Sequence, residues 1–160
     1  ETSSVIDATC GKGYDTEYVA ALGVSRIDAY DIQKVAIETT TTRLQQKGLL
    51  KNVFFYHQSH ETFVNSADLV VYNLGYLPGG DQSITTKSAT TLTSLKNALQ
   101  FATALLITCY PGHEEGQKEE FFIKNFLQNL AAKHWIVSHH TWPNRKACPS
   151  IFWVIRQKFS

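Results

Sequence analysis

Short runs of β-branched and aromatic residues alternate along the chain with longer stretches in which apolar residues recur every three or four positions. Such runs are typical of buried strands, and such stretches of amphipathic helices. The pattern predicts strands at 4–7, 26–30, 53–56, 69–72, 105–109, 135–140 and 151–156. It predicts helices at 15–22, 35–47, 86–102 and 115–132, with Gly23 and Gly48 as C-terminal caps that need a positive φ. This alternation indicates a mostly parallel sheet with helices on both faces.

The last two predicted strands carry the most information about topology. Only residues 141–150, which include Pro143 and Pro149, separate them. A parallel crossover needs a dozen or more residues, usually with a helix, so we expect an antiparallel final pair. Class I methyltransferases that use S-adenosylmethionine (SAM) have such a seven-stranded sheet with an inserted antiparallel last strand, whereas dinucleotide dehydrogenases normally finish parallel. The predicted fold class is therefore α/β, a Rossmann-like class I methyltransferase fold.

The chain has 160 residues, of which 43% are hydrophobic, and this suits one domain with a single core. We expect one methyltransferase domain over 1–160. Because the sequence begins at Glu1 and contains no Met, we expect that an N-terminal segment is missing, with omitted selenomethionines as the alternative. No run of about 18 apolar residues indicates a membrane span, so we expect a cytoplasmic protein. The oligomeric state stays open, a homodimer included.

The distribution of charge indicates which kind of partner the chain could bind, and the cysteines indicate whether it holds disulfides or zinc. Residues 121–160 hold six Lys and Arg residues and no acidic residue, while the first 120 residues carry nine bases and fourteen acids. A basic C-terminal quarter, with Arg145 and Lys146 in it, favours a polyanionic partner, although solvated bases without a partner are the alternative. Cys10, Cys109 and Cys148 are far apart and form no C-x-x-C, which argues against disulfides and a zinc ribbon.

A glycine-rich turn follows the first predicted strand, from Asp7 to Gly13. Its spacing, Gly11-Lys12-Gly13, lacks the third glycine of the dinucleotide fingerprint and the Lys-Ser/Thr pair of a phosphate-binding loop. Asp7 at the strand end would repel a pyrophosphate but suits the cationic amino group and sulfonium region of SAM. A merely tight strand-to-helix turn is the alternative. The other candidate cofactor contacts in this segment are Thr9, Asp15 and Thr16.

The second predicted strand leads to Asp31, eighteen residues after Gly13. A carboxylate at this position can accept hydrogen bonds from both ribose hydroxyls, as in other nucleoside-binding α/β folds. Ile32 and Gln33 would flank the adenine. Alternatively, Asp31 only caps the helix that starts near Val35.

Three further loops leave the carboxyl ends of predicted strands, where open α/β sheets bind ligands. The loop after the third strand offers Ser59 and His60 to the cofactor, and its H-x-x-H spacing without a third ligand is weak evidence for a metal site, so we expect none. The loops after the fourth and fifth strands could meet a methyl acceptor. Asn73 and Leu74 are candidate cofactor contacts, and the candidate residues toward the acceptor are Asn73, Gly75, Tyr76, Gly79 and Asp81, and Tyr110, Gly112, His113 and Glu115.

Five blocks of this sequence together resemble one bacterial family, YtqB/MnmM, whose members have been named as rRNA methylases. The blocks are D-A-T-C-G-K-G-Y-D-T at 7–16, Q-S-H-E at 58–61, N-L-G-Y-L-P-G-G-D at 73–81, I-T-T at 84–86 and Y-P-G-H-E-E-G at 110–116. The likeness covers nearly the whole chain, and the 73–81 block is specific to the family. It implies a tRNA 5-aminomethyl-2-thiouridine methyltransferase that uses SAM and binds the anticodon region. Two departures are Lys12, where the family usually has Asn, and the short segment before the first strand.

The resemblance suggests roles for the acceptor loops. We expect Asn73 and Tyr76 to position the acceptor amine, and Asp81 or His113 to accept or relay its proton. The expected substrate contacts are Gly75, Tyr76, Gly79, Tyr110, Gly112, Glu115, Arg145 and Lys146. Rival functions are methylation of rRNA, a protein or a small molecule on the same fold, and a SAM- or tRNA-binding module without turnover. A nicotinamide oxidoreductase is disfavoured by the glycine spacing and the terminal hairpin.

Overall fold

Seven strands form one sheet in a computed structural model that describes residues 3–75 and 88–157. The strands are β1 (Ser4–Asp7), β2 (Arg26–Asp31), β3 (Val53–His57), β4 (Leu69–Asn73), β5 (Ala104–Cys109), β6 (Trp135–His140) and β7 (Ser150–Arg156). The helices are α1 (Tyr14–Ala21), α2 (Lys34–Gln46), α3 (Ser88–Phe101) and α4 (Glu114–Gln128). Each strand begins and ends within one residue of its predicted bounds. Gly23 and Gly48 have φ values of 77° and 69°, as predicted for C-terminal caps.

The prediction was wrong at the end of α4, which stops at Gln128 and not at residue 132. The Asn129 side chain donates a hydrogen bond back to the carbonyl of Asn125, at 2.6 Å. A tight turn then follows, in which the amide of His134 donates to the carbonyl of Ala131, at 2.8 Å. The helix-favouring alanines at 131 and 132 therefore belong to the connection that turns the chain into β6.

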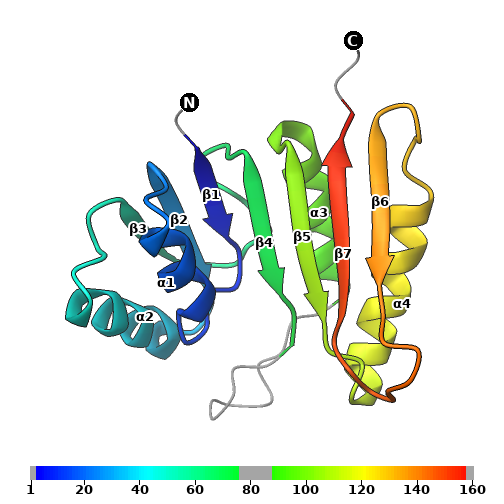
Figure 1. The fold of residues 1–160 in the computed structure, drawn as a ribbon, viewed down its shortest axis with the longest axis horizontal. Helices are drawn as coiled ribbons and strands as arrows, with labels where there is room; N and C mark the ends of the chain where they lie inside the picture. Colours follow the sequence, from blue (N-terminus) through cyan, green and yellow to red (C-terminus); the bar gives the residue numbers. More distant parts are fainter. Residues whose placement is uncertain (1–2, 76–87, 158–160) are drawn as a thin grey trace.

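The strand order is β3-β2-β1-β4-β5-β7-β6 (Figure 1). All neighbours from β3 to β5 are parallel, and β7 runs antiparallel to both β5 and β6. The predicted antiparallel final pair is thus confirmed, with β7 inserted between β5 and the edge strand β6. The short connection leaves no room for the crossover that a parallel pair would need.

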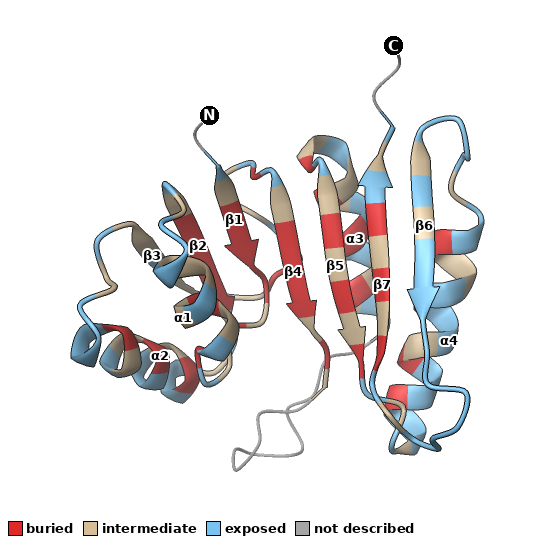
Figure 2. Ribbon diagram, viewed as in Figure 1, coloured by how far each residue is buried: buried red, intermediate tan, exposed pale blue. Residues whose placement is uncertain are grey.

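Helices lie on both faces of the sheet. In Figure 1, α1 and α2 lie in front of the half that contains β1, β2 and β3, while α3 and α4 lie behind the other half. Side chains on the rear face of β4, β5 and β7 form the core with α3 and α4, and Figure 2 shows buried positions alternating along β5 and β7. Central members are Tyr72, Leu95, Ile107, Ile123 and Phe152.

The predicted loops converge on one edge of the sheet. β1, β2, β4 and β5 are parallel, so their carboxyl ends meet there. The β6–β7 loop returns to the same edge, because Ser150 at the start of β7 pairs with Cys109 at the end of β5. Within the described residues, no helix has the length and apolar character needed to cross a membrane.

Candidate functional site

Side chains of α2 hold the backbone of the glycine turn that follows β1. Gly11 and Gly13 have φ values of 52° and 78°, which suit glycine. A Cβ on Gly13 would lie 2.6 Å from Cγ2 of Thr40, so any larger residue would clash. The Thr40 hydroxyl donates to the carbonyl of Gly11 at 3.1 Å, and Nε of Arg43 donates to the carbonyl of Lys12 at 2.7 Å.

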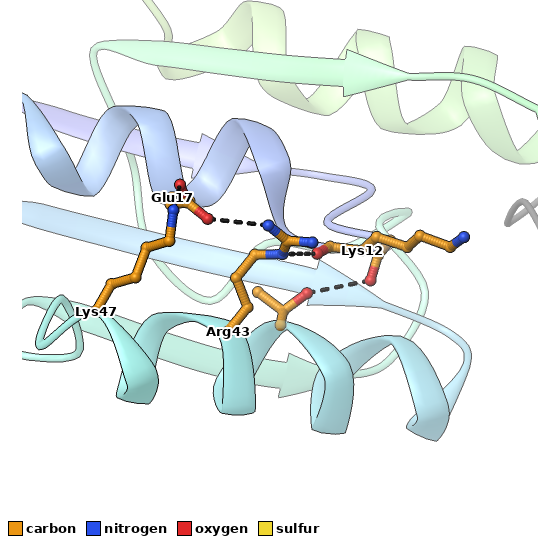
Figure 3. A network of polar contacts seen from close by, with 6 residues as sticks. Lys12, Glu17, Arg43 and Lys47 are labelled. Atoms are coloured by element: carbon orange, nitrogen blue, oxygen red, sulfur yellow. Dashed lines mark hydrogen bonds and ion pairs between the residues drawn. The ribbon is translucent and has the colours of Figure 1, made fainter.

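An ion-pair network extends this anchor to α1. The Arg43 guanidinium contacts the Glu17 carboxylate at 3.1 Å, and Lys47 contacts the same carboxylate at 2.6 Å (Figure 3). The Lys12 side chain is exposed and extends away from Glu17. Sequence reasoning missed Thr40 and Arg43. Their spacing of three places them on one helix face, but only the packing of α2 against the turn shows what that face meets.

Asp7 is a buried carboxyl group beside this turn, with 3% of its surface exposed. It accepts hydrogen bonds from the Thr16 hydroxyl at 2.5 Å and from the amide of Thr9 at 3.3 Å. Burial raises the pKa of Asp7 to about 7; the Thr16 hydrogen bond opposes this rise, and the charges of Asp15 and Asp31 add to it. A cation placed here would be stabilised by the ionised carboxylate.

Asp31 links the end of β2 to the glycine turn. One carboxylate oxygen accepts from the amide of Gly11 and the other from the amide of Gln33, both at 2.9 Å. Burial raises the pKa of Asp31, and these backbone hydrogen bonds oppose the rise. A carboxylate has about four lone-pair sites, so Asp31 keeps acceptor capacity for a ligand hydroxyl. The neighbouring Ile32 side chain is 61% exposed, although it is large and apolar.

Asn73 at the end of β4 is held by residues from three other segments. Its amide nitrogen Nδ2 donates to the carboxylate of Asp15 in α1, and its Oδ1 accepts from the Tyr110 hydroxyl at 2.7 Å. Its backbone amide donates to the Thr9 hydroxyl at 2.7 Å. Burial, helped by the charge of Asp15, raises the pKa of Tyr110, which keeps its hydroxyl protonated as a donor. The structure thus brings four predicted site residues together.

The segment after β5 makes contacts that fix the start of α4. His113 is the N-terminal cap of that helix, and its Nδ1 accepts from the amide of Gly116 at 3.1 Å. A Cβ on Gly116 would lie 2.1 Å from the carbonyl oxygen of Tyr110, so the helix and the preceding loop meet closely. Glu115 is exposed and pairs with Lys118 at 3.0 Å. Contacts of His113 and Glu115 with a substrate stay predictions.

The other predicted residues fall into three places. The Ser59 hydroxyl donates to the Glu61 carboxylate at 3.0 Å, and His60 and Leu74 are buried, with burial lowering the pKa of His60. Arg145 and Lys146 are exposed in the β6–β7 loop, which approaches Gly112. Tyr76, Gly79 and Asp81 lie outside the described residues, as does the start of the predicted helix at 86.

Across the part of the chain that the structure describes, no three His, Cys, Asp or Glu side chains gather closely enough to bind a metal ion.

Comparison with known proteins identifies the family. The family model described as "Putative rRNA methylase" matches residues 27–156. The chain belongs to this family. The likeness of its motifs to these methylases is therefore confirmed.

Relatives with known structures share the fold. A Clostridium thermocellum protein described in the same words is 32% identical, with a TM-score of 0.93 over 98% of this chain and 90% of that one. A Streptococcus mutans protein described as a putative methyltransferase, solved with S-adenosylhomocysteine (SAH), is 28% identical with a TM-score of 0.88 over the same shares. These matches confirm the predicted class I methyltransferase fold.

A curated relative is the Arabidopsis thaliana chloroplastic tRNA (mnm(5)s(2)U34)-methyltransferase. It is 34% identical over 176 aligned positions, which cover 97% of this chain. This chain spans 64% of the length of the Arabidopsis protein.

Proposed function

We propose that this chain is a SAM-dependent methyltransferase whose acceptor is the amine of 5-aminomethyl-2-thiouridine at the tRNA wobble position. The observation that carries the proposal is the fixed Asn73 side chain beside the turn that joins Asp7 and Asp31. A side chain that can position the methylated amine and a site suited to the nucleoside of SAM therefore lie at the same edge of the sheet. The reaction named for the Arabidopsis relative and the SAH in the Streptococcus structure support this choice.

The residues around the glycine turn fit SAM. Asp31 has acceptor capacity left for the ribose hydroxyls, and the exposed Ile32 offers an apolar surface to the adenine. The ionised form of Asp7 favours a cationic amino group. The exposed Lys12 ammonium lies on the same turn, where it can pair with the carboxylate of the methionine part. When bound, SAM supplies a methyl group carried on a positively charged sulfur.

On the acceptor side, the chain contributes alignment. Asn73 Oδ1 already accepts one hydrogen bond from Tyr110, and a carbonyl oxygen has a second lone pair. We propose that this lone pair accepts a hydrogen bond from the attacking amine and so turns the nitrogen lone pair toward the methyl group. Holding two reactants in such near-attack geometry supplies much of the rate in a direct displacement. Asp81 stays the proposed acceptor of the amine proton; His113 could serve only after releasing the amide of Gly116, because its Nδ1 lone pair accepts that hydrogen bond.

The anticodon region of tRNA would approach the same edge. Arg145 and Lys146 lie in the β6–β7 loop beside the end of β5, where they can contact phosphates.

A direct test incubates the protein with SAM and with tRNA that carries 5-aminomethyl-2-thiouridine, followed by mass analysis of the nucleosides. We expect one added methyl group at that nucleoside and none in tRNA that lacks the aminomethyl group. Asn73→Ala should slow the transfer while SAM affinity, measured by calorimetry, stays nearly unchanged. SAM binding without methylation of this tRNA would overturn the proposed acceptor. A lack of SAM binding would indicate a module without turnover.

A further inference from the structure

A shallow pocket of about 320 Å³ lies beside the β6–β7 loop, on the front face of the sheet. Its lining residues are His140, Thr141, Trp142, Ile151 and Trp153. Two indole rings and one imidazole ring therefore surround a space at the lower end of the range that small ligands occupy. The Trp142 side chain is 58% exposed, so part of its indole ring is open to a ligand.

A turn beside this pocket brings the backbone of Trp142 close to that of Arg145. The amide of Arg145 donates to the carbonyl of Trp142 at 3.0 Å, with Pro143 at the second position, where its fixed φ favours such turns. The Cα atoms at the two ends of a β-turn lie within about 7 Å of each other. Lys146 follows directly, so two exposed basic residues stand at the end of the turn that begins with the exposed indole.

The pocket lies on the same sheet face and edge as Asn73. Asn73 pairs with Thr108, Thr108 with Ile151, and Ile151 with His140, so these four residues form one row across β4, β5, β7 and β6. Three steps between neighbouring strands amount to about 14 Å. In the described residues, α1 and α2 do not extend over this half of the front face (Figure 1).

We propose that this pocket receives an unpaired nucleobase of the RNA close to the nucleotide that is methylated. The base stacks on Trp142, and Arg145 and Lys146 contact the adjoining phosphates. This inference rests on the proposed function, because it takes RNA as the substrate. Aromatic rings beside basic residues are the usual means by which proteins bind single-stranded nucleic acid.

Charge favours RNA over a second copy of the chain as the occupant. Residues 121–160 contain no acidic residue. Glu120 lies on α4 and contacts Ser150 and His139. The ring of His139 stacks on the core residue Phe152, so this acidic residue lies on the face of the sheet opposite to the pocket. Two such basic loops facing each other in a dimer would repel, whereas a polyanion would be attracted.

The test measures binding of a fluorescently labelled anticodon stem–loop RNA by anisotropy, with SAH present and at several salt concentrations. Trp142→Ala should raise Kd about 5- to 150-fold and leave the salt dependence of binding unchanged, because a stacked base carries no phosphate contact. Trp142→Phe should keep most of the affinity. Phe121→Ala is the matched control, because Phe121 is 61% exposed but lies on α4, and its Kd should equal that of the wild type.

Trp142→Leu keeps an apolar side chain without a ring, and it tests the proposal if the alanine variant does not fold. Equal RNA affinity of the wild type and the Leu or Ala variant would overturn the pocket but not the proposed function, which the methylation assay tests separately. Failure of the wild type to bind RNA would overturn both. A wild-type dimer in sedimentation that Trp142→Ala splits, without loss of RNA affinity per chain, would assign the pocket to a second copy.

Discussion

The buried carboxyl group of Asp7 should make the stability of the protein depend on pH. Its pKa rises from an ordinary value of 3.8 to about 7, because the side chain is buried and its surroundings disfavour the charge. Each pKa unit corresponds to about 1.4 kcal/mol. Because the folded state binds this proton more tightly than the unfolded chain, the contribution is present below pH 4 and is lost as pH rises to about 7. The total change is about 4 kcal/mol.

Asp7→Asn removes the ionisation and keeps the size of the side chain. Urea unfolding of both proteins at intervals from about pH 4 to pH 8 gives the difference in the free energy of unfolding, in which contributions from the other carboxylates cancel. We expect the wild type to lose up to about 4 kcal/mol relative to the variant as pH rises. Thr16→Val, which removes the hydroxyl that donates at 2.5 Å, should destabilise the protein more at high pH than at low pH.

The same group should couple SAM binding to pH. A cationic amino group favours the ionised carboxylate, so SAM affinity of the wild type should increase between about pH 5 and pH 7, and the Asp7→Asn variant should lack this part of the increase. Parallel stability profiles for the wild type and Asp7→Asn across this range would refute the reasoning, because Asp7 would then titrate alike in the folded and unfolded chains.

Four further predictions concern other parts of the site and fold. Asp31→Ala should weaken SAM binding by about 1–3 kcal/mol in calorimetry, and unchanged affinity in a folded variant would contradict the ribose assignment. Asn73→Ala should lower kcat in single-turnover assays more than it changes KM for tRNA; wild-type rates would mean that its hydrogen bonds are only structural. Replacing Arg145 and Lys146 with Ala should reduce the salt dependence of RNA binding by up to about two in slope, and an unaltered slope would place the RNA elsewhere. Gly116→Ala should destabilise the fold by about 1–3 kcal/mol in urea, since its Cβ would lie 2.1 Å from a backbone oxygen, and an unchanged midpoint would show that the loop yields.

The elements were predictable because their signals are local. Buried strands such as β4 appear as short β-branched runs, and the length of the 141–150 connection alone determines that β7 is antiparallel. The end of α4 was missed because Ala131 and Ala132 favour a helix, while the turn that stops it depends on the approach to β6.

The site was predictable in part. The positions of Asp31 and Asn73 at strand ends follow from the alternation of strands and helices. Their partners do not follow from it, because Asp15 and Tyr110 lie 58 and 37 residues away from Asn73 and meet it only through the strand order. The hydrogen bond from Thr40 to the glycine turn is of the same kind. Such contacts arise from tertiary packing, on which a local pattern carries no information.

The anchoring of the glycine turn by α2 bears on how position 12 can evolve. The carbonyls of Gly11 and Lys12 are held by Thr40 and Arg43, so the backbone path does not depend on which side chain position 12 carries. Exchange between an amide and an ammonium group at this position would therefore alter the charge presented to a ligand and leave the shape of the loop intact. The residue at position 12 can therefore change at little cost to folding, and such a change would alter the preference of the site for anionic groups.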